Sequence, residues 1–215
     1  NLTIADPSGR IPAQPISLIA ALAADATGEA DTVRFQLPIC NGAVMVGGQD
    51  AGNFDVAGSF DAASQKGEFK AELAGINQNL LIPFTAGALG DKRLQTVAIN
   101  GGAQGKFDLK NSSEFKANLS VSDLVIIDPS GQIPATPLAV SVGANGVMTG
   151  KQLELKDSSL KLAPTERADN QLKLSGRVDF SDPAALSANL LLAANTLDFT
   201  QYYDLFAGGS SAPAP

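Results

Sequence analysis

The sequence predicts an all-β protein in which repeated antiparallel hairpins form one long curled sheet, a β-groove, with at most a short helix near the C-terminus. Three observations predict this fold. Apolar and polar residues alternate in many segments, which is the pattern of strands with one dry face and one wet face. Turn-forming pairs such as Gly-Gly, Asn-Gly and Asp-Pro separate these segments at intervals of about ten residues. Several segments are also repeated, as in stacked arrays of hairpins.

Composition limits the class of protein. Of the 215 residues, 44% are hydrophobic and 17% are charged, which is ordinary for a globular protein and too apolar for disorder. The net charge of −7 argues against nucleic acid as a partner, because phosphate binding needs clustered Lys and Arg. The sequence contains no run of 18 apolar residues that could span a bilayer. Its first residues lack a basic stretch followed by an apolar one, so we expect that any signal peptide was removed or lies outside this sequence.

The first long segment, residues 16–30 (ISLIAALAADATGEA), is rich in good helix formers, and propensity alone favours a helix. Its counterpart in a second copy, residues 138–146 (LAVSVGANG), has no helical character. The aligned positions form one alternating apolar set: Ile16, Leu18 and Ala20 in the first copy, and Leu138, Val140 and Val142 in the second. We therefore expect a strand here.

The same alternation predicts further strands over residues 33–37, 54–60, 115–121 and 172–180. Residues 54–73 parallel residues 172–190, and residues 105–119 are a third, partial echo, so the recurring unit is strand, turn, strand. We divide the chain into a first β repeat unit (1–104), a second unit of the same continuous sheet (105–206) and a flexible tail (207–215). The tail, AGGSSAPAP, has the composition of a linker.

A longer repeat connects these units. Residues 2–18 (LTIADPSGRIPAQPISL) and 124–140 (LVIIDPSGQIPATPLAV) are identical at 10 of 17 positions. Asp-Pro-Ser-Gly favours a type I turn, and the following Ile-Pro-Ala is extended because proline excludes helix, so we expect a connection between hairpins. The alternative is a duplicated calcium site that uses Asp6 and Asp128, but the dense acidic spacing of calcium loops is missing.

No catalytic, metal or cofactor site emerges from the sequence. The absence of histidine excludes Ser-His-Asp triads and His-ligated zinc, and the single Cys40, expected as a half-buried thiol, excludes an internal disulfide. Ser158 and Lys161 match the S-x-x-K pattern of acyl-serine hydrolases, but the segment predicts a turn into a strand instead of a helix. Asp179 and Asp182, a carboxylate pair that could serve a glycosidase, are expected in a turn. We expect a protein that is not an enzyme.

Residues 172–206 carry the pattern L-S-G-x-V-D, then A-N-L, then L-D-F with a tyrosine soon after. Together with the repeated Asp-Pro-Ser-Gly connector, this pattern resembles the AsmA-like proteins of Gram-negative envelopes, which are relatives of TamB and of repeating β-groove lipid carriers. The resemblance implies a non-enzymatic protein of the periplasm or cell envelope whose sheet forms a trough with an apolar inner face. Members usually carry an N-terminal membrane helix, so the resemblance implies an anchor outside this sequence, and we expect a piece of a longer protein.

A one-sided apolar sheet must cover its face with a second sheet, a helix or a ligand. The only helix we expect is Gln201–Phe206, with Thr200 as N-cap, at one end of the trough. Lipid acyl chains would suffice as cover, because each buried methylene yields roughly 0.8 kcal/mol. We therefore expect acyl chains as partners, in outer-membrane homeostasis or lipid transport between membranes. The expected lipid-binding residues are Phe115, Leu119, Leu172, Leu174 and Leu190. The alternative is a structural or interaction β-sandwich with a closed core and no ligand.

Overall fold

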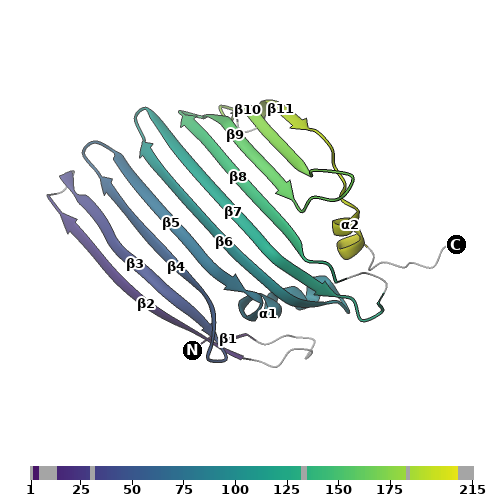
Figure 1. Cartoon of the computed structure of the whole chain (residues 1–215). Coiled ribbons are helices and arrows are strands. Elements are labelled where there is room, and N and C mark those ends of the chain that lie inside the picture. Colours follow the sequence, from purple (N-terminus) through teal and green to yellow (C-terminus); the bar gives the residue numbers. More distant parts are fainter. Residues whose placement is uncertain (1, 5–13, 30–31, 132–134, 183–184, 208–215) are drawn as a thin grey trace.

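The structure, a computed structural model, describes residues 2–4, 14–29, 32–131, 135–182 and 185–207 (Figure 1). Its strands are β1 (Leu2–Ile4), β2 (Gln14–Thr27), β3 (Arg34–Val46), β4 (Gln49–Asp61), β5 (Lys66–Asn77), β6 (Arg93–Asp108), β7 (Ser112–Ile127), β8 (Leu138–Thr149), β9 (Gln152–Leu162), β10 (Gln171–Asp179) and β11 (Ser187–Ala194). Its helices are α1 (Gln78–Leu89) and α2 (Thr200–Ala207).

All eleven strands form one sheet, in the order of the chain, and each strand is antiparallel to its neighbours. Figure 1 shows the strands side by side in a single open layer, with both helices near one end of the sheet. The prediction of an all-β sheet of repeated antiparallel hairpins is confirmed. No second sheet packs on this one within the described residues, so they do not form the closed sandwich of the alternative hypothesis. Neither described helix is long and apolar enough to cross a membrane.

The sequence repeat has the same strand register in both copies. Leu2 pairs with Ile16 across β1 and β2, and Leu124 pairs with Leu138 across β7 and β8. β1 is thus the counterpart of the end of β7, and β2 is the counterpart of β8, which confirms that the helix-prone segment is a strand. The two expected units lie in one continuous sheet, and the boundary at residues 104 and 105 falls inside β6.

The helix α1 was not expected from the sequence. It begins after Asn77, whose side-chain oxygen accepts a hydrogen bond from the backbone N–H of Asn79 at 3.0 Å, and it contains Pro83. The helix α2 was expected, but with Thr200 as its N-cap. In the structure the cap is the Asp198 carboxylate, which accepts a hydrogen bond from the backbone N–H of Thr200 (3.1 Å). Thr200 is the first residue of the helix and donates its hydroxyl hydrogen to the same carboxylate (2.7 Å).

The buried core lies where the two helices meet the sheet. Leu94 and Val97 of β6, Ile126 of β7, Leu138 of β8 and Leu205 of α2 form one apolar cluster, on which Leu81, Ile82 and Leu89 of α1 also pack. A second set of contacts holds α2 in place. The hydroxyl of Tyr202 donates to the carbonyl of Ala139 (2.7 Å) and accepts from the N–H of Ala163 (2.9 Å), while the Lys92 ammonium donates to the carbonyl of Leu205. The helices therefore cover only one end of the sheet.

Candidate functional site: an open apolar sheet face

Strand register shows which residues share a face of the sheet, because residues paired across neighbouring strands point to the same side. One row crosses nine strands and alternates large side chains with glycine. It consists of Leu37, Gly58, Phe69, Gly105, Phe115, Gly146, Leu155, Gly176 and Leu190. We name this set the phenylalanine–glycine row.

A second row on the same face is almost entirely apolar. It consists of Phe54, Leu73, Gly101, Leu119, Val142, Leu160 and Leu172. Between the two rows lies a line of small residues: Val56, Ala71, Ala103, Ala117 and Ala144. Successive residues of a strand point to opposite faces, so Leu174 of β10 lies on this same side as Leu172. We name this side of the sheet the apolar face.

All five residues expected to bind lipid lie on the apolar face, spread over β7, β10 and β11. Phe69 and Leu73 of β5 occupy the same two rows but were not among the expected residues. Their signal was present in the repeat, because Glu-Phe-Lys-Ala-Glu-Leu at residues 68–73 matches Glu-Phe-Lys-Ala-Asn-Leu at residues 114–119. That match predicts that Phe69 is the counterpart of Phe115.

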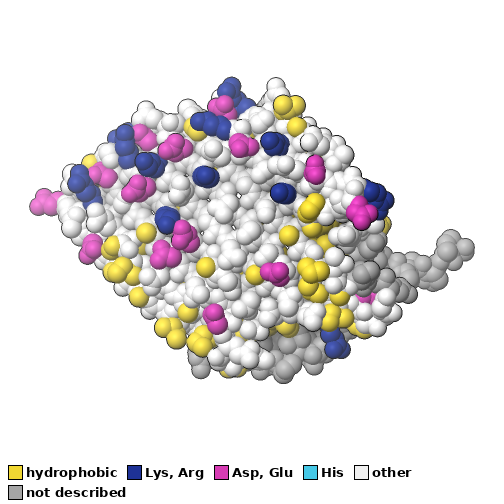
Figure 2. All heavy atoms as spheres, viewed as in Figure 1, with side chains coloured by type: hydrophobic (Ala, Val, Ile, Leu, Met, Phe, Trp, Pro, Cys, Tyr) yellow, Lys and Arg dark blue, Asp and Glu magenta, His cyan; other side chains and the backbone are white. Residues whose placement is uncertain are grey.

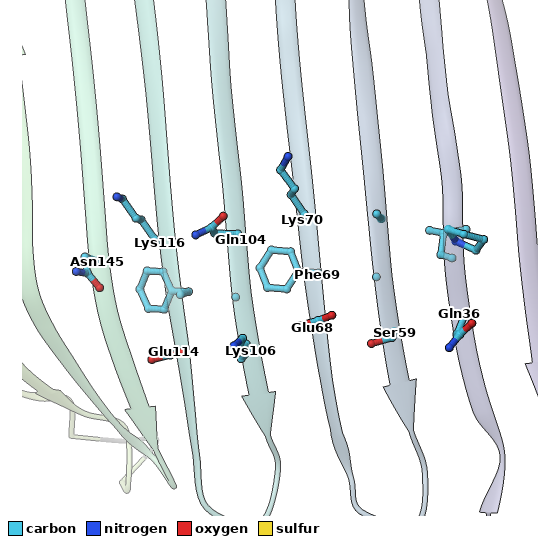
Figure 3. Close-up of a pocket in the computed structure, with 16 residues that line it drawn as sticks. Gln36, Ser59, Glu68, Phe69, Lys70, Gln104, Lys106, Glu114, Lys116 and Asn145 are labelled. Carbon is cyan, nitrogen blue, oxygen red and sulfur yellow. The ribbon is translucent and has the colours of Figure 1, made fainter.

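The glycines of the row make room for the aromatic rings. A Cβ atom added at Gly105 would lie 2.7 Å from a ring carbon of Phe69, and one added at Gly146 would lie 2.8 Å from a ring carbon of Phe115. Figure 3 shows the Phe69 ring extending from β5 toward β6. Each ring thus lies on the backbone of the next strand, which shields that backbone and stabilises the pair of strands.

The apolar face remains largely open to solvent in the region of these rings. Phe69 is 42% exposed and Leu119 is 41% exposed. A hollow of about 410 Å³ lies over β2 to β6 and is lined mainly by residues of this face, among them Phe35, Phe60 and Phe107. A second hollow, of about 580 Å³, also touches Leu37 and Phe69 but is lined mostly by residues of the opposite side of the sheet, among them Glu68, Lys70 and Lys116 (Figure 3). Contiguous exposed apolar surface is uncommon on soluble proteins, so the apolar face is the candidate binding surface.

The opposite side of the sheet is polar. It carries ion pairs between neighbouring strands, such as Arg177 with Glu154, whose charged groups lie 3.8 Å apart. It also carries pairs within one strand, such as Lys70 with Glu72, where the ammonium lies 2.8 Å from a carboxylate oxygen. Figure 2 shows a face of the molecule on which side chains of both charges are intermingled. The contact with Glu72 raises the pKa of Lys70. We name this side the polar face. Its charged side chains are solvated by water, so only the apolar face needs a cover.

Three aspartates that end strands hold the hairpin turns. Asp61 accepts a hydrogen bond from the backbone N–H of Ser64 (2.8 Å), and Asp179 accepts one from the N–H of Ser181 (2.8 Å). At Asp108, the Asn111 side chain and then the Lys66 ammonium lower the carboxyl pKa to about 2. The turn hydrogen bonds also lower the carboxyl pKa values of Asp61 and Asp179. A carboxyl group that acts as a general acid has a raised pKa instead. Asp179 is the last residue of β10 and not itself in the expected turn, although its carboxylate holds the turn that follows. Asp182 lies in a turn as expected, and its carbonyl accepts a hydrogen bond from the N–H of Ala185 (3.2 Å).

The second Asp-Pro-Ser-Gly segment is a turn, as predicted. The N–H of Gly131 donates to the carbonyl of Asp128 (3.0 Å), and the Asp128 carboxylate accepts from the N–H (3.0 Å) and the hydroxyl (2.7 Å) of Ser130. The first copy, with Asp6, lies outside the described residues. Among the described residues, no three acidic or cysteine side chains gather into a group that could hold a metal ion.

Two further expectations concern single side chains. Ser158 lies inside β9 and not at the start of a helix, so the predicted strand is confirmed. The predicted turn before it is wrong, because β9 already begins at Gln152. The hydroxyl oxygen of Ser158 is buried without a hydrogen-bond partner. Cys40 in β3 is a free, half-buried thiol, as expected.

Comparisons of the chain with protein-family models, curated proteins and solved structures found no match.

Proposed function

We propose that this chain is a non-enzymatic module that handles or shields lipid acyl chains on its apolar face. The observation that carries the proposal is the open apolar face itself, which crosses the sheet and is covered at one end by helices and left exposed over the phenylalanine–glycine row. An acyl chain of 16 carbons laid on such a face could gain at most about 10 kcal/mol from its methylenes. Because this gain requires no directed polar contact, it fits a face without a catalytic constellation.

The resemblance of residues 172–206 to AsmA-like proteins supports the same proposal and adds a place of action, the periplasm or envelope of a Gram-negative bacterium. In that setting the module would serve outer-membrane homeostasis or lipid transport between membranes. An acyl chain would lie across Phe115, Leu119 and Leu190, with Leu172 and Leu174 beside it. An anchor outside this sequence would hold the module at a membrane.

Native mass spectrometry of the purified protein, followed by lipid extraction, tests the proposal. We expect bound lipid on the wild type and its loss in Phe69→Asp, which places a charge on the apolar face. The matched control is Ser141→Asp, which adds the same charge to the polar face of β8 and should keep the lipid. Wild-type protein that binds no lipid, even after incubation with phospholipid vesicles, would contradict the proposal.

A further inference from the structure

The exposed part of the apolar face is large enough for a stable dimer. It crosses the eight strands from β3 to β10 and is four rows of residues deep, which on β4 are the rows of Phe54, Val56, Gly58 and Phe60. With strands about 4.8 Å apart and a rise of about 3.3 Å per residue, this zone measures about 38 Å by 23 Å, or about 900 Å². A standard protein interface buries about 800 Å² on each partner, so a second copy of the chain could cover the zone.

The fourth of these rows lies nearest the hairpin turns. Phe60 follows Gly58 by two residues, so the row of Phe60 is on the same side of the sheet as the phenylalanine–glycine row. Its members are Phe35, Phe60, Gly67, Phe107, Ser113, Met148, Leu153 and Val178. None of the residues named in the four rows is charged, so two copies with a net charge of −7 each would bring no like charges into contact here.

The side chains of β5 are complementary to their own image. Along this strand the four rows are occupied by Gly67, Phe69, Ala71 and Leu73. Large and small residues therefore exchange places when the strand is turned end over end about the midpoint between Phe69 and Ala71. A two-fold axis that crosses the strands at this point places Phe69 of one copy over Ala71 of the other. It also places Leu73 over Gly67.

The two strands beside β5 in the middle of the sheet repeat this exchange. The midpoint of β5 is Lys70, and register pairs Lys70 with Gln104 of β6 and Gln104 with Lys116 of β7, so one axis serves all three strands. A surface that packs on its own copy about a two-fold axis must match itself in this way, and packed layers fill space when large residues face small ones. The same axis places three more large side chains over small ones of the other copy: Phe115 over Ala117, Leu119 over Ser113 and Phe107 over Gly101.

The helices fix the direction in which the second copy can lie. Both pack on the apolar side at one end of the sheet (Figure 1). A helix is about 10 Å in diameter and two sheets pack about 10 Å apart, so the helices already fill the layer that a second sheet would occupy. The second sheet must therefore end where the helices begin. A two-fold axis across the strands satisfies this condition, because it places the helices of each copy beside the hairpin turns of the other.

We propose that two copies of this chain without bound lipid pack apolar face to apolar face in a closed two-fold dimer, with Phe69 and Phe115 of each copy over Ala71 and Ala117 of the other. A lipid and the second copy would cover the same surface, so bound lipid separates the dimer. The dimer itself does not rest on the proposed function, whereas its separation by lipid does.

Sedimentation of delipidated protein over a range of concentrations tests the dimer. We expect monomers and dimers but no larger species, because the contact uses the apolar face of both copies. Ala71→Phe keeps the face apolar but places a new ring against Phe69 of the other copy, so it should weaken dimerisation at least tenfold. Addition of Phe69→Ala to this variant exchanges large and small again and should restore the dimer. Ser141→Asp changes only the polar face and should dimerise like the wild type.

Circular dichroism confirms that these variants are folded. A delipidated wild type that stays monomeric, or a dimer that a folded Ala71→Phe leaves unchanged, overturns the proposal. A double variant that is folded but remains monomeric contradicts the register.

Cross-linking tests the orientation without any change to the apolar face. In a Cys40→Ser background, protein carrying Gln65→Cys, at the turn before β5, is mixed with protein carrying Ala88→Cys, in α1; both positions are exposed. Within one copy they lie about 40 Å apart, because the length of β5 separates them. In the dimer, Gln65 of one copy lies beside α1 of the other, so a short bismaleimide should join the two different variants. Products that join only like variants overturn the orientation.

Addition of phospholipid vesicles to the delipidated dimer distinguishes this proposal from the proposed function. We expect the dimer to convert to lipid-bound monomers. A dimer that never takes up lipid contradicts the proposed function and leaves the dimer standing. Protein that binds lipid but is monomeric after delipidation contradicts the dimer and leaves the proposed function standing.

Discussion

The substitution Leu119→Asp distinguishes an open apolar face from a dry core. Leu119 is 41% exposed in the second apolar row, and one of its methyl groups lies over Gly101 of the neighbouring strand. Full burial of a leucine is worth about 1.5–3 kcal/mol, so the loss of the hidden part costs roughly 1–2 kcal/mol. The new carboxylate can stay hydrated on the open face, so little is added for the charge.

The matched variant is Leu138→Asp, because Leu138 is 1% exposed in the cluster between the helices and the sheet. A carboxylate without a partner in that place should cost roughly 4 kcal/mol or more. For a domain of this size, each kcal/mol lowers the melting temperature by about 2–4 °C. We therefore expect Leu119→Asp to melt about 2–8 °C below the wild type and Leu138→Asp to unfold outright or melt far lower.

Thermal unfolding followed by circular dichroism measures the stability of both variants, and lipid extraction from the same samples measures the ligand. Leu119→Asp should be folded and free of lipid. If Leu119→Asp unfolds as completely as Leu138→Asp, and the wild type carries no lipid, the face is a core that some other layer covers, and both the open face and the proposed function are wrong.

Three further predictions follow from individual contacts. The pKa of Asp108 is lowered from 3.8 to about 2, so its interactions stabilise the fold above about pH 3.8 and are lost as the pH falls toward 2; an NMR titration should give this midpoint, and Asn111→Ala should raise it. Gly146→Val should cost about 1–3 kcal/mol in denaturant unfolding, because its Cβ would lie 2.8 Å from a ring carbon of Phe115 and 2.9 Å from the carbonyl oxygen of Glu154; an unchanged midpoint would show that the ring does not lie on the strand. Cys40→Ser should cost less than about 1 kcal/mol and leave the lipid content unchanged, and a loss of lipid with the fold intact would reveal a role for the thiol.

The strands could be predicted because each carries its own local signal, and the repeat resolved the one conflict, at β2. The helix α1 could not be predicted, because Leu80 to Phe84 is an unbroken apolar run that contains a proline and lacks the spacing of an amphipathic helix. Besides the Asn77 cap, the helix is held by Leu81, Ile82 and Leu89, which pack on the buried cluster, and these contacts are not local in the sequence.

The candidate site was predicted only in part, because its residues come together through contacts that are not local in the sequence. Alternation placed Phe115 and Leu119 on one face, but the pairing of each phenylalanine with a glycine on the next strand depends on register. The register shifts at irregular positions, for example between Leu37 and Asn41 and between Leu73 and Ile76, which no periodic pattern predicts. The faces of distant strands could therefore be aligned only from the structure.

The two ends of the apolar face differ in a way that bears on how a ligand would bind. α1 follows β5 and α2 follows β11, the counterpart of β5 in the repeat, and both helices pack on the same buried cluster. The opposite end, near the hairpin turns, carries the stacked rings of Phe60 and Phe107 (centroids 5.8 Å apart) and the open hollow beside them. The helices thus complete a core at one end only. A chain-like apolar ligand laid along the strands would extend that core to the turns, and it would enter from the end that the helices leave uncovered.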